Sequence, residues 1–131
     1  MSGGNKRPVI MLADDDIEIR RILVRALSEL DAEILEASDG EEALETIIQR
    51  QPDLVILDVM MPTLSGWELC KYIRSKPNLE HMAVLMLTAI GRTVNEMTSP
   101  LYGADAYMDK PFDIQEVLET VNTLLTEKVA R

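Results

Sequence analysis

Cysteine is almost absent from this chain: Cys70 is the single one among 131 residues. One thiol cannot form an internal disulfide, which fits a reducing compartment, and we therefore expect a cytoplasmic protein. Cys70 falls on the apolar face of a predicted helix. We expect it to be a small core residue.

Long hydrophobic runs and aromatic residues are also scarce. No run reaches the roughly 18 apolar residues that a membrane helix needs, and the polar first residues lack the apolar stretch of a signal peptide. Aromatic residues make up only 4% of the chain, so Leu, Ile, Val and 8 Met must fill the core. The length suits one domain, which we place at residues 8–127, between a disordered extension at 1–7 and a tail at 128–131.

Positive charge is the third scarce feature. Lys and Arg number 13 against 23 Asp and Glu, for a net charge of −10. Binding to nucleic acid requires basic patches that neutralise phosphates. We therefore expect no direct contact with nucleic acid, and we expect no contact with a membrane.

What the chain does have is a regular alternation of short apolar runs and amphipathic stretches. The apolar runs predict five strands, at 9–13, 33–37, 53–57, 83–88 and 106–108. Helices are predicted between them and after the last, at about 17–30, 40–51, 66–75 and 114–127, with a short or irregular one within 91–102 because of Pro100. Such alternation predicts an α/β fold, a doubly wound (βα)5 sheet of five parallel strands with helices on both faces. The pattern alone leaves two common strand orders open.

Three of the predicted helices begin with capping signals. Asp39 with Glu42, and Ser65 with Glu68, have the spacing of a capping box. Asp113 precedes the last helix in the same way. These signals support the predicted helix starts.

Polar residues follow four of the strands at the point where each strand ends. Asp14 and Asp15 follow the first strand, Asp58 the third, Thr88 the fourth and Lys110 the fifth. Parallel strands end at the same edge of a sheet, which is where open α/β sheets bind ligands. We therefore expect these side chains to converge.

Carboxylates that converge repel one another, which raises their pKa values. A Mg²⁺ ion would relieve this repulsion, because it prefers oxygen ligands and needs only one or two protein carboxylates. We predict a metal site made by Asp14, Asp15, Asp58 and the backbone carbonyl of Met60. Helix capping is the simpler explanation for any one aspartate of the run Asp14 to Asp16, but not for the pair combined with Asp58.

Beside a cation, the Asp58 carboxylate could attack phosphorus and form an acyl phosphate. Phosphoryl transfer depends mainly on positioning and on neutralising charge. The Lys110 ammonium and the Thr88 hydroxyl could supply both. We therefore predict that Asp58, Lys110 and Thr88 carry the chemistry.

Several motifs together resemble the response regulator receiver domain (CheY-like) of two-component signalling: Asp14-Asp15, Asp58 with Pro62 and Gly66, Thr88-Ala89, and Lys110-Pro111-Phe112. The resemblance covers about residues 8–127. It implies the flavodoxin-like strand order 2-1-3-4-5 and makes Asp58 the phosphoacceptor. It also implies Mg²⁺ bound by Asp15, Asp58 and the Met60 carbonyl, with Asp14 helping through water, and a cis peptide between Lys110 and Pro111. Such a domain is not an enzyme in the ordinary sense, since it assists only its own phosphorylation and dephosphorylation.

The resemblance further implies a switch in which phosphorylation draws the Thr88 hydroxyl toward the phosphoryl group and Tyr107 moves inward. The phosphoryl donor would be a sensor histidine kinase or a histidine phosphotransfer protein. It would dock on the first helix, at Ile17, Arg20, Arg21 and Val24. A downstream protein would bind the face made by the fourth helix, fifth strand and last helix, and a phosphorylation-dependent dimer is also open.

Two positions where this family tunes hydrolysis of the acyl phosphate are apolar in this chain. They are Met60 and Ile90, which lie two residues past Asp58 and Thr88. Neither side chain can orient an attacking water by hydrogen bonding. We therefore expect a phosphorylated state that lasts minutes to hours rather than seconds.

Other functions fit the sequence less well. A receiver-like module that is never phosphorylated usually lacks an acidic residue or the lysine, and none is missing here. Asp14-Asp15-Asp16 satisfies the D-x-D motif of haloacid dehalogenase-type phosphatases, but the small or hydroxyl residues expected after it are absent. A flavin carrier would need Ser, Thr and Gly in the first loop, which is acidic instead. A standalone regulator and a piece of a longer transcription factor or kinase are both compatible with the chain.

Overall fold

The computed structural model describes residues 7–88 and 103–130, and of residues 128–130 the backbone alone. The strands are β1 (Val9–Ala13), β2 (Glu33–Ala37), β3 (Leu54–Asp58), β4 (Ala83–Thr88) and β5 (Ala106–Asp109). The helices are α1 (Ile17–Leu27), α2 (Gly40–Arg50), α3 (Gly66–Ser75) and α5 (Ile114–Ala130). The predicted extension at 1–7, apart from Arg7, and the predicted helix within 91–102 lie outside the described residues.

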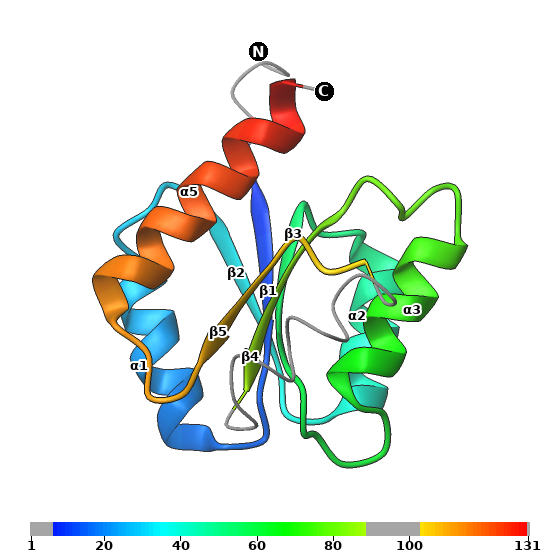
Figure 1. Ribbon diagram of the computed structural model, residues 1–131, viewed down its shortest axis with the longest axis horizontal. Helices are drawn as coiled ribbons and strands as arrows, with labels where there is room; N and C mark the ends of the chain where they lie inside the picture. The colour runs from blue at the N-terminus through cyan, green and yellow to red at the C-terminus, as the bar shows by residue number, and fades with distance from the viewer. Residues whose placement is uncertain (1–6, 89–102, 131) are drawn as a thin grey trace.

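The five strands form one sheet in which every pair of neighbours is parallel (Figure 1). Their order is β2-β1-β3-β4-β5. The predicted α/β class is therefore confirmed, and so is the strand order that the family resemblance implied. Because all strands are parallel, their carboxyl ends lie together at the lower edge of the sheet in Figure 1.

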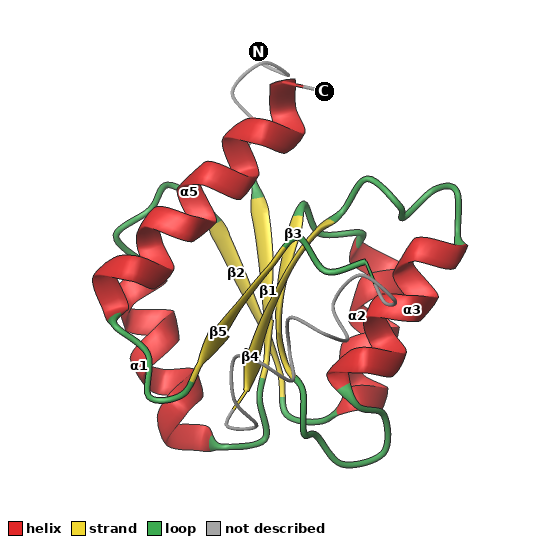
Figure 2. Ribbon diagram, in the orientation of Figure 1, coloured by secondary structure: helices red, strands yellow, loops and turns green. Residues whose placement is uncertain are grey.

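Helices cover both faces of the sheet, with α1 and α5 on one side and α2 and α3 on the other (Figure 2). Successive side chains of a strand point to opposite faces, and β1 divides its residues accordingly. Ile10 and Leu12 join the core under α1 and α5, whereas Met11 and Ala13 join the core under α2 and α3. A central strand buried on both faces must be apolar throughout, which explains the continuous apolar runs in the sequence.

Cys70 lies in α3 and is fully buried in the core under α2 and α3. Burial raises the pKa of its thiol to about 11, so the group stays protonated at neutral pH. The prediction that Cys70 is a core residue is confirmed. Within the described residues, no helix is both long and apolar enough to cross a bilayer.

The predicted helix caps are present, with one change of partner. Ser65 and Glu68 form a full capping box at α3, and the Asp113 carboxylate accepts the N–H of Gln115 at 2.8 Å before α5. At α2, Asp39 accepts the N–H of Glu42, but Glu42 accepts the N–H of Ser38 rather than that of Asp39. The predicted capping box at α2 is therefore wrong in one of its two bonds.

Some element ends differ from the prediction. Helix α1 ends at Leu27 rather than near residue 30, and the N–H of Ser28 then donates to the carbonyl of Val24. Strand β3 begins one residue later than expected, after Asp53, whose carboxylate accepts the N–H of Val9 at 2.8 Å. It extends to Asp58 because Asp58 still pairs with Leu87 of β4. Helix α5 continues past residue 127 to Ala130.

The start of α2 supports the loop that follows β3. The N–H of Gly40 donates to the carbonyl of Pro62, and the N–H of Glu41 donates to the hydroxyl of Thr63 at 3.0 Å. Thr63 has a φ of 69°, a left-handed conformation that is unusual for a β-branched residue. A Cβ added at Gly40 would overlap the backbone carbonyl of Leu64. The loop after Asp58 is therefore packed against a position that only glycine can occupy.

Replacing Gly40 with alanine tests this packing. Helix propensity alone would favour alanine by roughly 1 kcal/mol, but the overlap with Leu64 must shift the loop. We expect Gly40→Ala to lower the free energy of unfolding by about 2 kcal/mol or more in urea titrations. The exposed α2 variant Glu45→Ala is the control and should stay within about 0.5 kcal/mol of the parent. A Gly40→Ala protein more stable than the parent would contradict the close approach.

Candidate functional site

Four strand ends bring the predicted site residues to the lower edge of the sheet in Figure 1. Asp14 follows β1, Asp58 ends β3, Thr88 ends β4 and Lys110 follows β5. Asp58 is in register with Leu87, next to Thr88, and the N–H of Lys110 donates to the carbonyl of Thr88 at 2.7 Å. The polar groups that the sequence spreads over nearly a hundred residues thus share one edge.

Three carboxylates form the acidic part of the site. Asp14, Asp15 and Asp58 each offer an oxygen, and these oxygens lie within 4.8 Å of one another. Asp14 is fully buried and Asp58 is 5% exposed, whereas Asp15 is open to solvent. Three negative groups this close, two of them buried, need a counter-charge.

Lys110 supplies a counter-charge. Its Nζ lies 2.9 Å from Oδ2 of Asp14 and 3.4 Å from Oδ2 of Asp58. The shorter contact is a hydrogen bond, so in this state the ammonium binds Asp14 more closely than Asp58. The peptide between Lys110 and Pro111 is cis, as the family resemblance implied.

Backbone contacts fix the loop that carries Asp14 and Asp15. Oδ1 of Asp14 accepts the N–H of Asp16 at 2.9 Å, and Asp16 in turn caps α1 by accepting the N–H groups of Glu18 and Ile19. The capping explanation therefore applies to Asp16. It leaves the carboxylates of Asp14 and Asp15 to the acidic cluster.

The loop after β3 holds the other side of the site. Oδ1 of Asp58 accepts the N–H of Met60 at 3.1 Å, which leaves Oδ2 toward Lys110. The Met60 side chain is 65% exposed at the rim. A Cβ at Gly66 would lie 2.7 Å from the Asp58 carbonyl oxygen, so the start of α3 approaches the strand end directly.

The environment shifts two pKa values in the site. Burial, followed by the negative charge of Asp14, raises the pKa of Asp58 to about 6, although Lys110 and the Met60 N–H oppose the shift. Burial works against the charge of Lys110, but its hydrogen bond and attraction to Asp14, together with Asp58, outweigh that cost and raise the pKa of the ammonium. The lysine therefore stays charged while Asp58 titrates unusually high.

The donor set fits a Mg²⁺ ion. All three groups are carboxylates, one is exposed to water, and the cluster carries more negative charge than Lys110 neutralises. A small hard cation takes one or two carboxylates and keeps several waters. Such an ion could be held by Asp14, Asp15 and Asp58. Met60, whose carbonyl is the fourth predicted ligand, is next to this cluster because its N–H donates to Asp58.

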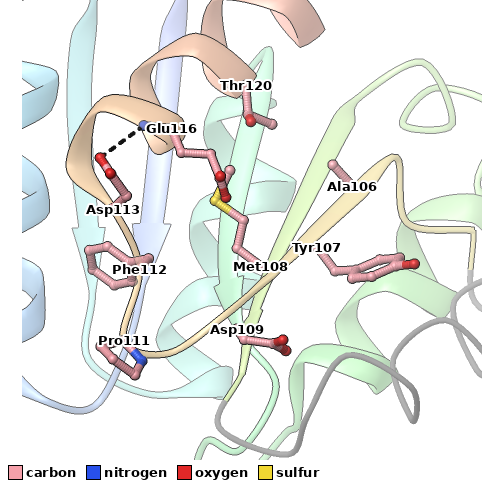
Figure 3. Close-up of a pocket in the computed structure, with 9 residues that line it drawn as sticks. All are labelled: Ala106, Tyr107, Met108, Asp109, Pro111, Phe112, Asp113, Glu116 and Thr120. Atoms are coloured by element: carbon pink, nitrogen blue, oxygen red, sulfur yellow. Dashed lines mark hydrogen bonds between the residues drawn. The ribbon is translucent and has the colours of Figure 1, made fainter.

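Thr88 and Tyr107 lie on neighbouring strands. Thr88 is fully buried at the end of β4, and Tyr107 is half-buried in β5, in register with Met86. Figure 3 shows the Tyr107 ring turned to the opposite side of β5 from Met108. A cavity of about 500 Å³ lies along β5 and the start of α5, lined by Tyr107, Phe112 and Glu116 among others.

The predicted docking residues on α1 are not equally available. Ile17 is 50% exposed and Arg21 is also exposed. Val24 packs against the core under α1 and α5, and the Arg20 side chain is only 14% exposed. Ile17 and Arg21 are therefore accessible to a partner, whereas Val24 and Arg20 face inward.

Residues 10–122 match the sequence pattern of the response regulator receiver domain. The chain belongs to the response regulator receiver domain family. This membership excludes the phosphatase and flavin-carrier alternatives that the sequence left in view. It also identifies the chain as a regulatory domain of two-component signalling.

Relatives and solved structures agree with the assignment of a receiver domain. A probable transcriptional regulator, ycf27 of Cyanophora paradoxa, is 40% identical over 121 residues, which is 92% of this chain and 49% of the relative. The DNA-binding dual master transcriptional regulator RpaA of Synechocystis is 36% identical over 118 residues, 90% of this chain and 49% of the relative. The chain thus spans about half the length of these regulators.

Two solved structures show how well the fold is shared. A putative response regulator from Chloroflexus aurantiacus has a TM-score of 0.86 at 35% identity, over 92% of this chain and 99% of that chain. The chemotaxis response regulator CheY4 of Vibrio cholerae has a TM-score of 0.84 at 28% identity, over 91% and 99%. The receiver domain therefore has the CheY-like fold along nearly its whole length.

The contact of Arg20 with the loop that carries Asp14 was not anticipated from the sequence. Arg20 donates from its guanidinium to the backbone carbonyl of Asp14 at 2.6 Å. A basic residue on the helix that follows an acidic loop is the only signal for this contact. Such a signal is weak, because it does not tell which atom the guanidinium will reach.

The raised pKa of Asp58 predicts a pH-dependent effect on stability. In the unfolded chain the carboxyl group has its ordinary pKa of 3.8, and in the metal-free fold about 6. The folded protein therefore binds the proton on Asp58 more tightly than the unfolded chain does. The resulting gain in the free energy of unfolding is fully present below about pH 4 and is lost as the pH rises through about 6. Ionised Asp58 destabilises the metal-free receiver domain at neutral pH.

Asp58→Asn should remove this cost. In EDTA above about pH 7, we expect the free energy of unfolding of the variant to exceed that of the parent by about 1–3 kcal/mol. This difference should shrink toward pH 4. Urea titrations at a series of pH values measure it, with the exposed Asp31→Asn as control. A gain that is the same at both ends of the pH range would contradict the assigned burial cost.

Proposed function

We propose that this receiver domain accepts a phosphoryl group on Asp58 from a phosphohistidine, in a Mg²⁺-dependent reaction. The donor is a sensor histidine kinase or a histidine phosphotransfer protein. One observation carries the proposal: the carboxylates of Asp14, Asp15 and Asp58 lie within 4.8 Å of one another, with Lys110 in contact with two of them. A carboxylate that can accept the phosphoryl group, placed beside a positive charge, suits phosphoryl transfer.

In the transfer, an Asp58 carboxylate oxygen forms the new bond to phosphorus while the bond from phosphorus to the histidine nitrogen breaks. The imidazole keeps the electron pair of the broken bond. Lys110, 3.4 Å from Oδ2 of Asp58, is near enough to neutralise a phosphoryl oxygen, and the Thr88 hydroxyl would bind another. Mg²⁺ held by Asp14, Asp15, Asp58 and the Met60 carbonyl would neutralise the remaining charge.

Asp58 must be ionised to attack. Its pKa of about 6 in the metal-free protein means that a fraction of the group is protonated in mildly acidic solution. The positive charge of a bound divalent cation favours the ionised carboxylate. The proposed cation would therefore also prepare the nucleophile.

The proposed output is a change in partner binding. Thr88, engaged by the phosphoryl group, would shift, and Tyr107 would move inward from its half-buried position in β5. A downstream protein would then bind the face made by β5, α5 and the helix predicted within 91–102, which lies outside the described residues, and a phosphorylation-dependent dimer there is a further candidate. We place this signalling in the cytoplasm, and we assign no DNA contact to this chain, given its net charge of −10.

A receiver-like module that is never phosphorylated is the competing function. The test is incubation with acetyl phosphate and Mg²⁺, followed by intact-mass measurement. We expect one added phosphoryl group in the parent, none in Asp58→Asn, and strong reduction in Lys110→Ala and in EDTA. Asp31→Asn, at an exposed position just before β2 and so at the other end of the strands, is the control and should react like the parent. Undiminished modification of Asp58→Asn would place the acceptor elsewhere.

The exposed Met60 side chain predicts a slow loss of the phosphoryl group. Met60 is apolar, so it cannot hold an attacking water, and we expect the acyl phosphate to last minutes to hours after removal of acetyl phosphate. Met60→Gln adds a hydrogen-bonding group at this rim and should shorten the half-life by about tenfold. Intact mass over time measures it. A parent half-life of seconds would contradict the prediction.

A further inference from the structure

Arg20 is the one basic residue of the predicted docking face that the fold draws inward. It lies in α1, and its side chain is 14% exposed. One Nη donates to the backbone carbonyl of Asp14 at 2.6 Å, and Nε lies 3.4 Å from a carboxylate oxygen of Glu36 in β2. Arg20 therefore joins α1 and β2 to the loop that carries Asp14 and Asp15.

The neighbouring Arg21 provides the comparison. It is exposed, and its side chain makes no hydrogen bond or ion pair with the described residues. The two arginines contribute the same charge to the same helix, but only Arg20 contacts the loop. Any role that depends on charge alone would be shared by both.

The carbonyl contact matters because the Asp14 carboxylate makes its charged contact with a group that the site must rearrange, while the Asp14 N–H is held by the carbonyl of Ala37 at 3.2 Å. Oδ2 of Asp14 is bound to Lys110 at 2.9 Å, and that ammonium is the group proposed to turn to the phosphoryl oxygens. When it does so, the Asp14 carboxylate keeps only the Asp16 N–H among these contacts. The Arg20 bond is made to the main chain, so it can hold the loop whether or not Lys110 has moved.

We propose that Arg20 is a positioning residue for the divalent-cation site: through the Asp14 backbone carbonyl it fixes the loop whose carboxylates would bind the ion. The inference rests on the proposed function, since that function supplies the cation. Contacts of this kind behind metal ligands typically change metal affinity 10- to 100-fold. The sign of the effect separates positioning from electrostatics, because deleting a positive charge near a cation site should by itself tighten cation binding.

The experiment measures Mg²⁺ affinity in the unphosphorylated protein by isothermal titration calorimetry. We expect Arg20→Met to weaken Mg²⁺ binding about tenfold and Arg21→Met to leave it unchanged or slightly tighter. Arg20→Lys can still reach one partner, so its affinity should be intermediate. Thermal unfolding in EDTA, and the rise in unfolding temperature on adding Mg²⁺, separate loss of affinity from loss of folding.

The outcomes are distinct. If Arg20→Met binds Mg²⁺ as well as Arg21→Met does, or more tightly, the inference is overturned while the proposed function stands. If the parent itself binds no Mg²⁺, the cation site of the proposed function fails, and the inference fails with it. If Arg20→Met proves too unstable to titrate, Arg20→Lys decides: affinity equal to that of the parent overturns the role, and affinity reduced several-fold supports it.

Discussion

The contact of Lys110 with two buried aspartates is the interaction on which the rest of the site depends. In the strand order β2-β1-β3-β4-β5, Lys110 follows the outermost strand, β5. Asp14 follows β1 and Asp58 ends β3, and both of these strands lie on the far side of β4 from β5. The long lysine side chain spans that separation, and its Nζ reaches both carboxylates within 3.4 Å. Removing it would leave two carboxylates together in a region from which water is largely excluded, which is costly for both.

That arrangement leaves the site with more negative charge than its single ammonium neutralises. Burial and the neighbouring Asp14 push the pKa of Asp58 up to about 6, and the lysine only partly opposes them. The same excess of negative charge that destabilises the metal-free protein is what would attract a divalent cation. Stability and function therefore compete at one place, as they commonly do at functional sites.

Much of this could be predicted from the sequence because it depends on short-range patterns. Apolar runs about five residues long mark the buried strands, and the residues after them fall at one sheet edge once the strands are parallel. The strand order came only with the family resemblance, since pattern alone does not choose it. Contacts made by a single long side chain could not be predicted: the preference of Lys110 for Asp14, the bond of Glu42 to Ser38, and the reach of Arg20 to the Asp14 carbonyl each depend on three-dimensional placement.

The opposite edge of the sheet is built on a different principle. There the guanidinium of Arg74, near the end of α3, donates to the carbonyls of Gly103, Glu80 and Met82 and to the carboxylate of Asp105. The same Asp105 carboxylate accepts the N–H of Val84, so one ion pair ties the starts of β4 and β5 to α3. Each of the three guanidinium nitrogens of Arg74 has an acceptor, and its charge is paired with that of Asp105. At the functional edge, three carboxylates share one ammonium, and charge is unbalanced. The two ends of the strands therefore differ in charge: Arg74 and Asp105 neutralise each other at one end, whereas the other end keeps an excess of negative charge that a divalent cation could neutralise.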